Sequence, residues 1–347
     1  MTVFAFAIPF FGPQHAMGVP REIGAAPCRA DARILPWLSW LSGLTPPPSW
    51  LSLSSGYTER MFSDLALARR LERAEGVANA ESVAARARLS PGRGAASIEV
   101  AGARAMFDGV DSPLTQTFGL GLSGPVRPED LAAIEAFFAE RAAPVFHEVC
   151  PLADPGLLPL LNERRYQPWE FTSVLYRPIG PGADEAGSGR IPRSATPSSP
   201  VAERGIRPDP MDVHVINESE HDIWARTAAA GWSEYPELAG FLADIGQVTV
   251  ARANTYCFLA SLGGEPIATG ALSLHDGVAL LAGASTVPSG RRRGAQLALL
   301  DARLRFAVEH GCDLAMMGAA PGSASQRNAE RNHFRIAYTR LKWKRRG

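Results

Sequence analysis

The sequence STVPSGRRRGAQLALL occupies residues 285–300 and joins an apolar strand to a long helix. The strand is expected to end at Val287, because Pro288 has no N–H to donate to a sheet. Apolar residues then recur at helical spacing from Leu297 to Val308. The first N–H groups of a helix have no partner within it, and its dipole adds positive potential there. This junction therefore predicts an anion site.

Three arginines, Arg291, Arg292 and Arg293, precede Gly294 at this junction. Guanidinium groups bind phosphate oxygens in pairs, and a glycine lets a phosphate approach the main chain closely. The alternative is an ordinary helix start with solvated charges, since charge runs are commonly exposed. Arginines oppose the dipole at a helix start unless an anion is bound, which favours a diphosphate site.

The elements around this junction alternate between strand and helix patterns. Gly263-Gly264 and His275-Asp276-Gly277 tolerate positive φ and are expected to connect three antiparallel strands. The expected helices are 222–230, 236–245, 297–308 and 323–331, and the expected strands are 255–262, 265–274, 278–287, 314–317 and 334–343. This order predicts an α+β fold with a mixed, mostly antiparallel sheet flanked by helices.

Three motifs of this region resemble the GNAT superfamily of N-acetyltransferases over residues 208–345. They are Ser285-Thr286-Val287-Pro288, Arg291-x-x-Gly294-x-Gln296, and the run 318–328 with Phe334. The family pattern at the loop is Gln/Arg-x-x-Gly-x-Gly/Ala, which this chain matches at Arg291 and Gly294 and leaves at Gln296.

The resemblance implies acetyl-coenzyme A as co-substrate and no metal. It implies that main-chain N–H groups of residues 292–297 bind the pyrophosphate, and that Val287 and Asn328 lie beside the pantetheine arm. The cofactor-binding residues expected in this way are Thr286, Val287, Arg291, Arg292, Arg293, Gly294, Ala295, Gln296, Leu297 and Asn328.

The chain departs from the family where a tyrosine commonly protonates the leaving thiolate, because Ala329 stands there. His333-Phe334 replaces the usual Gly-Phe. The candidate catalytic residues are bases at Glu234, His275 and Asp276 and a replacement acid at Tyr338, each with the alternative of a surface, turn or core role. The oxyanion is expected to meet a strand N–H near Val287.

The helix-strand-helix-strand order at the end of the segment 61–177 repeats that of the segment 208–347 at a shift of 168 residues, which places Tyr166 on Phe334. We therefore expect two GNAT-like sheets, the first being a degenerate copy; the alternative is an unrelated α+β domain. Pro125, Val126 and Pro128 occupy the loop of the first copy. Prolines donate no N–H, so this loop is not expected to bind coenzyme A.

Two further segments have the composition of irregular chain. Residues 1–60 are rich in proline and tryptophan without period, which predicts a low-order extension, and Met61 is a candidate initiator. Residues 178–207 are rich in glycine, serine and proline, as in a flexible linker. The apolar stretch 3–11 lacks a basic start, so no signal peptide is predicted.

The composition sets limits on partners and compartment. Lys+Arg and Asp+Glu are equal at 35 each, which predicts no nucleic-acid or membrane partner. The four cysteines are far apart and make no metal-ligand spacing. No apolar run reaches a membrane span, and a cytoplasmic protein is expected.

The sequence favours an acyl-coenzyme A-dependent N-acyltransferase that moves an acetyl group directly to a primary amine in a ternary complex. The acceptor is a small-molecule or peptide amine that no motif identifies, and the sequence predicts neither acyl chain length nor oligomeric state. The absent tyrosine at Ala329 keeps a second hypothesis open, a non-catalytic coenzyme A-binding or regulatory module. A site for another nucleotide ranks lowest, since no Gly-x-x-x-x-Gly-Lys-Ser/Thr loop is present.

Overall fold

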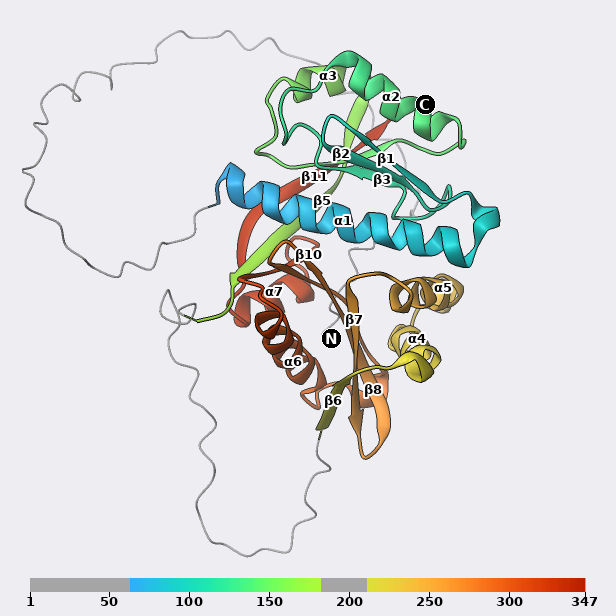
Figure 1. The fold of residues 1–347 in the computed structure, drawn as a ribbon, viewed down its shortest axis with the longest axis vertical. Coiled ribbons are helices and arrows are strands. Elements are labelled where there is room, and N and C mark those ends of the chain that lie inside the picture. The colour runs from blue at the N-terminus through green and yellow to red at the C-terminus, as the bar shows by residue number, and fades with distance from the viewer. Residues whose placement is uncertain (1–62, 182–210, 347) are drawn as a thin grey trace, which may run out of the picture. The chain divides into compact units, whose positions relative to one another are not determined.

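The structure, a computed structural model, describes residues 63–181 and 211–346 (Figure 1). These residues belong to one compact unit. The predicted extension 1–60, the apolar stretch 3–11, Met61 and linker residues 182–207 lie outside the described residues. The division into separate domains 61–177 and 208–347 stays a prediction.

The described strands form one eleven-stranded sheet in the order β1-β2-β3-β4-β11-β5-β10-β9-β8-β7-β6. Only the β3/β4 and β9/β10 pairs are parallel. The strands are β1 Ala96–Val100, β2 Ala103–Phe107, β3 Gln116–Phe118, β4 Phe146–Val149, β5 Tyr166–Pro178, β6 Met211–Val215, β7 Thr255–Leu262, β8 Glu265–His275, β9 Val278–Thr286, β10 Leu314–Ala319 and β11 Arg335–Arg345. The α+β class with a mixed, mostly antiparallel sheet is confirmed, and the two expected sheets are joined into one.

Seven α-helices of the described chain flank this sheet (Figure 1). They are α1 Leu65–Leu89, α2 Pro128–Ala139, α3 Leu157–Glu163, α4 His221–Ala230, α5 Ala239–Val250, α6 Ala295–Glu309 and α7 Ala324–Arg331. The predicted turns have the expected conformations, with φ of +83° at Gly264 and +47° at Asp276. Strand β6 at residues 211–215 was missing from the prediction.

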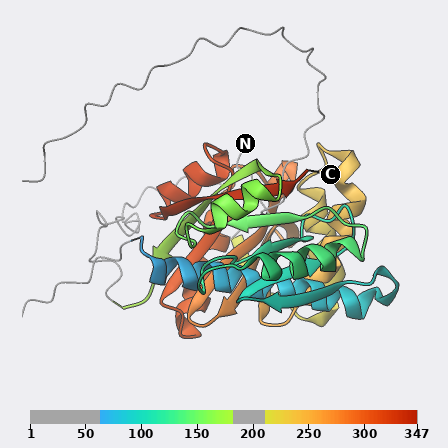
Figure 2. The ribbon, with the colours of Figure 1, turned by 90° about the horizontal axis from the view of Figure 1, so that it is seen from above.

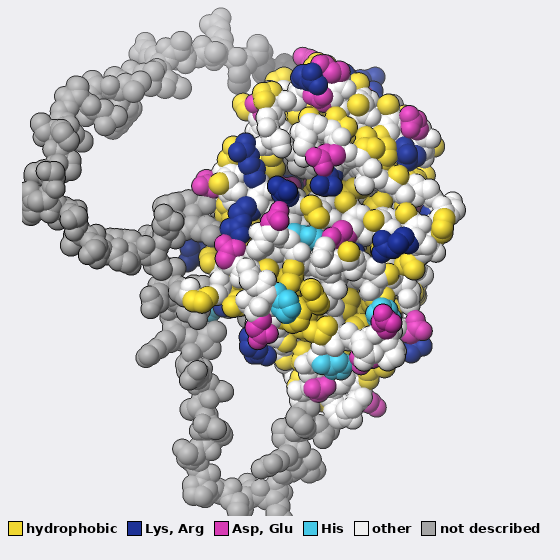
Figure 3. Space-filling view, viewed as in Figure 1, with side chains coloured by type: hydrophobic (Ala, Val, Ile, Leu, Met, Phe, Trp, Pro, Cys, Tyr) yellow, Lys and Arg dark blue, Asp and Glu magenta, His cyan; other side chains and the backbone are white. Residues whose placement is uncertain are grey.

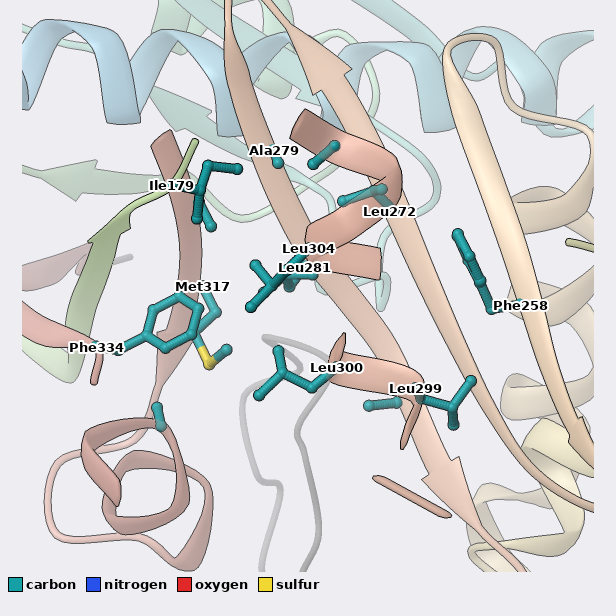
Figure 4. Packing of buried hydrophobic residues seen from close by; sticks show 14 of the residues in the cluster. Ile179, Phe258, Leu272, Ala279, Leu281, Leu299, Leu300, Leu304, Met317 and Phe334 are labelled. Carbon is teal, nitrogen blue, oxygen red and sulfur yellow. The ribbon is translucent and has the colours of Figure 1, made fainter. Parts of the chain in front are cut away.

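The side-chain alternation of the strands assigns the helices to the two faces (Figure 2). In the second half, Leu281 of β9 belongs to the core that contains α6, whereas Leu280 packs with α1. Trp224 of α4 is fully buried against β7 and β8 on the face of α1. Figure 4 shows the α6 face, where Leu300 and Leu304 lie near Leu281 and the residues of β10 and Phe334. Phe334, which follows α7 in the chain, thus packs into this core.

The last strands of the two halves are exchanged. β11, from the end of the chain, lies between β4 and β5, which both belong to the first half. β5 in turn pairs with β10 of the second half. Each half therefore completes its sheet only with a strand from the other.

Positive and negative side chains are intermixed on the face shown in Figure 3, as the equal numbers of basic and acidic residues suggest. No helix of the described chain is long and apolar enough to cross a bilayer.

Candidate functional site

The strands β9 and β10 run side by side only at their beginnings. Their parallel ladder joins residues 278–280 to residues 314–316. Beyond it, β9 continues to Thr286 in pairing with β8, while β10 continues to Ala319 in pairing with β5. The two strands therefore separate, and their carboxyl ends leave a gap in the sheet.

The arginine-rich loop closes the wide end of this gap. A short turn, Pro288–Gly290, follows β9, and Arg292 and Gly294 both have positive φ, at +63° and +83°. Gly290 lies so close to Ile267 that an added Cβ would meet its Cβ at 2.8 Å. A Cβ at Gly294 would meet nothing within 4 Å, so this glycine faces open space and is required by its conformation.

Helix α6 begins directly after Gly294, which is its N-cap. The Ala298 N–H makes the first main-chain bond of the helix, to the Gly294 carbonyl. The N–H groups of residues 295–297 have no partner within the helix, and its first turn holds no acidic residue. This helix start therefore offers donors and positive potential to an anion.

A pocket of about 570 Å³ lies over this helix start. Its lining is Thr286, Pro288, Gly290, Arg291, Arg292, Gly294, Ala295, Gln296, Leu297, Asn328, Arg331 and Asn332. Two predicted residues, Val287 and Arg293, belong to the same loop but do not line the pocket. Arg331 and Asn332 at the end of α7 were missed, although Arg331 is one helical turn beyond Asn328.

Gln296, the departure from the family pattern, ties the helix start to the strand. Its Nε2 donates to the Ser285 carbonyl at 2.8 Å and to Thr286 Oγ1 at 2.7 Å. Its Oε1 is buried without a hydrogen-bond partner among the described residues. This oxygen is thus a buried acceptor whose hydrogen-bonding capacity the described residues do not satisfy.

Arg291 connects the loop to residues 231–235. Its Nη1 donates to Glu234 Oε1 at 3.0 Å and its Nη2 to the Gly231 carbonyl at 3.1 Å. A Cβ at Gly231 would lie 1.9 Å from Ser285 Oγ, so only glycine permits this approach. The bond from Arg291 lowers the pKa of Glu234, whose half-exposed carboxylate lies beside the pocket-lining Arg291.

His275 lies at the other end of β9 from the loop, separated by the nine residues of that strand, or roughly 26 Å. Its side chain is buried near Glu81, at 3.4 Å, and burial lowers its pKa. The neighbouring Asp276 forms an exposed ion pair with Arg73. Neither residue lines the pocket.

Tyr338 lies on β11, also outside the pocket lining. It is buried and donates a hydrogen bond of 2.9 Å to Glu72 Oε1, and burial raises its pKa well above the usual value. Val287 donates its N–H to the Ile267 carbonyl at 2.9 Å. The hydroxyl and the N–H expected to serve as acid and oxyanion donor are thus engaged within the protein.

The family tyrosine position is filled by core packing. Ala329 is fully buried in the cluster that contains Phe334. His333 has a φ of +65°, the conformation that a glycine adopts most readily. The described fold therefore presents no hydroxyl at this point of α7.

The corresponding helix start of the first half supplies its own anion. Pro128 is the first residue of α2, and the Arg127 N–H donates to Asp130 Oδ2 at 3.0 Å. Hydrogen bonds from Arg127 lower the pKa of Asp130. A carboxylate of the protein thus lies at the start of α2, whereas the N–H groups at the start of α6 have no such partner among the described residues.

Neither a protein-family model nor a curated protein sequence matches the chain. Among solved structures, a GCN5-related N-acetyltransferase from Kribbella flavida shares 20% identity and a TM-score of 0.47, over 77% of this chain and 96% of that one. A tandem GNAT protein from the clavulanic acid biosynthesis pathway shares 13%, with a TM-score of 0.44 over 70% and 77%. The aminoglycoside N-acetyltransferase AAC(6')-Iy, with a bisubstrate analogue, shares 22%, with a TM-score of 0.31 over 37% and 92%. The chain is thus similar to GCN5-related N-acetyltransferases, one of them a tandem protein.

Proposed function

We propose that the chain is an acyl-coenzyme A-dependent N-acyltransferase. The observation that carries this proposal is the free start of α6, with open Gly294 and three arginines around it, at the wide end of the β9/β10 gap. The pyrophosphate binds the N–H groups of residues 295–297, with Arg291, Arg292 and Arg331 as counterions. Asn328, which lines the pocket, offers a partner to an amide group of a pantetheine arm.

In the proposed reaction the amine nitrogen attacks the thioester carbonyl, a C–N bond forms, and the C–S bond breaks to release a thiolate. Glu234 is the candidate base that the structure links to the loop, since it is half-exposed and bonded to Arg291. The oxyanion donors are assigned to the bulge at Gly283 and Ala284, opposite Gly270, where the β8/β9 register shifts. The amine gives up one proton, and the thiolate leaves without an acid from Ala329.

A thermal-shift titration tests the cofactor site. Coenzyme A and acetyl-coenzyme A are expected to raise the melting temperature by mass action, and ATP at equal concentration to raise it less. Gly294→Pro should remove the shift, because proline cannot adopt the φ of +83°. Wild-type protein that shows no stabilisation by any coenzyme A compound would overturn the proposal.

A second function, coenzyme A binding without turnover, is favoured by one observation, the buried Ala329 in place of an acid. Release of free thiol from acetyl-coenzyme A with a panel of primary amines distinguishes the two. Amine-dependent thiol release supports the transferase, whereas a thermal shift without release over the whole panel supports the binding module.

A further inference from the structure

Arg303 is a buried cation in the middle of α6. It is 1% exposed, and among the described residues its guanidinium donates to main-chain carbonyls alone, from Nε to Leu299 at 3.1 Å and from Nη1 to Ala271 at 3.2 Å and Ala282 at 3.4 Å. Within residues 63–181 and 211–346 no carboxylate pairs with it, and burial alone lowers its pKa to about 10. A buried charge without a counterion is unfavourable, which calls for a reason beyond packing.

The guanidinium borders a small cavity inside the gap between β9 and β10. The cavity holds about one water, at about 10 Å³ for a water-sized probe, and is lined by Leu281, Ala282, Ala284, Arg303, Met317, Gly318 and Ser325. The hydrogen bonds of Arg303 use Nε and Nη1, so the two N–H groups of Nη2 remain for a group in this cavity. Leu281 and Met317 of this lining belong to the apolar core seen in Figure 4, and Ser325 contributes a hydroxyl.

The strands are shaped to admit this side chain. A Cβ on Gly270 would lie 2.8 Å from Arg303 Cζ, so a glycine is required beneath the guanidinium. Opposite it, Gly283 has a φ of +59° within the bulge that interrupts the β8/β9 register. Nη1 braces the carbonyls of Ala271 and Ala282 beside the bulge, and Nε bonds the Leu299 carbonyl of the same helix. These hydrogen bonds do not explain why the residue is charged, because a neutral side-chain amide can donate to the same carbonyls.

The position along the helix relates this cavity to the pocket. Arg303 is eight residues beyond Ala295, which is about 12 Å along the helix axis. An extended pantetheine arm that starts at the pyrophosphate site spans such a distance within the gap. A thioester bound with its pyrophosphate at the helix start could therefore place its acyl end beside this cavity.

We infer that the acyl group carries a carboxylate of its own, as in the mono-thioesters of short dicarboxylic acids, and that Arg303 binds this carboxylate. The inference rests on the proposed function and names its donor class. One oxygen of the carboxylate takes the place of the water-sized content of the cavity and accepts from Nη2, which supplies the missing counterion. The product is then an amide that keeps a free carboxylate, with coenzyme A released as the thiol.

Isothermal titration without an amine tests the inference, with coenzyme A, acetyl-, malonyl- and succinyl-coenzyme A as ligands. The wild type is expected to bind malonyl- or succinyl-coenzyme A about tenfold or more tightly than acetyl-coenzyme A. Arg303→Gln, which keeps donors for the bulge but loses the charge, should bind all three acyl compounds alike and bind coenzyme A as the wild type does. Arg303→Lys should retain part of the preference.

Several outcomes overturn the inference. One is a wild type that binds acetyl-coenzyme A as well as the two dicarboxylic compounds, and another is a preference that survives in Arg303→Gln. If the variants fail to fold, the wild-type ranking decides alone. If one of these outcomes overturns the inference but the wild type still binds coenzyme A, the proposed function is unaffected. A wild type that binds none of the four ligands contradicts both the proposed function and the inference.

Discussion

Gly294 and Gly264 have the same backbone conformation, but only Gly294 lies at the proposed coenzyme A site. Both have a φ of +83° and nothing within 4 Å of an added Cβ, but only Gly294 is in the pocket loop. Gly294→Ala and Gly264→Ala should therefore lower stability by similar amounts, about 1 kcal/mol each. Only Gly294→Ala should weaken coenzyme A binding, by roughly tenfold, because its methyl group occupies the approach of the phosphate.

Titration of both variants with coenzyme A, together with their denaturant midpoints, checks this prediction. Equal loss of affinity in the two variants would mean that glycine flexibility in general, and not the approach to residue 294, is what binding requires.

At the same scale, the sequence predicted the loop residues better than the residues around them. Thr286 and Gln296 are close together in the chain, so a contiguous motif was enough to find them. Arg331 comes from another helix, and its approach to the loop depends on tertiary packing. Leu297 was expected as a cofactor-binding residue and is 53% exposed at the pocket, whereas Arg303, a charged residue of the same helix, is buried. Hydrophobic periodicity assigns apolar residues to the core and charged residues to the surface, and both of these residues depart from that rule.

Two of the arginine ion pairs of helix α1 differ greatly in burial. Arg86 is 1% exposed and bonds Asp108, which is also 1% exposed, whereas Arg70 and Asp313 are 36% and 60% exposed. Arg86→Leu should destabilise the protein by about 3–5 kcal/mol, because it leaves a buried carboxylate unpaired. Arg70→Leu should change stability by less than about 1 kcal/mol. Chemical denaturation of both variants measures the difference, and similar losses would contradict the role of burial.

The contact of α1 with β11 contains a carboxyl group that holds its proton near neutral pH. Burial raises the pKa of Glu72 to about 7 against the lowering effect of Arg340, and Glu72 Oε2 has no partner among the described residues. The folded protein therefore keeps a proton between pH 4.5 and about 7 that the unfolded chain releases, so this group's contribution to stability falls as pH rises through that window.

Glu72→Gln removes this contribution. The melting temperature of the variant minus that of the wild type should be larger at pH 8 than at pH 5, by several degrees if the effect is about 1–3 kcal/mol. Glu99→Gln, at an exposed carboxylate of β1, serves as the control. The assignment fails if the difference for Glu72→Gln is the same at both pH values.

Among the elements, the meander and α6 were predictable because their signals are local: turn glycines, alternation and a helix-ending Gly311. The pairing of β11 with β4 could not be predicted, because the sequence pattern of a strand shows which side chains share a face but not which strands lie beside it.

At the scale of the whole molecule, the exchanged strands predict that neither half folds alone. Fragments 63–181 and 211–346 should each be insoluble or unstructured when expressed singly, since each lacks a strand at the middle of its sheet. Expressed together, they should copurify with the circular dichroism of the intact protein. A single fragment with a cooperative melting transition would show that the exchange is dispensable.

The exchange of strands between the two halves also makes each half depend on the other for its strand pairing. The first half has Pro128 and Asp130 at its helix start, and these residues take no part in the strand pairing. Deletion of that half, however, would leave β11 without either neighbour and β10 without β5. The shared sheet thus makes the first half indispensable to the second as a structural partner, whether or not its own loop binds a ligand.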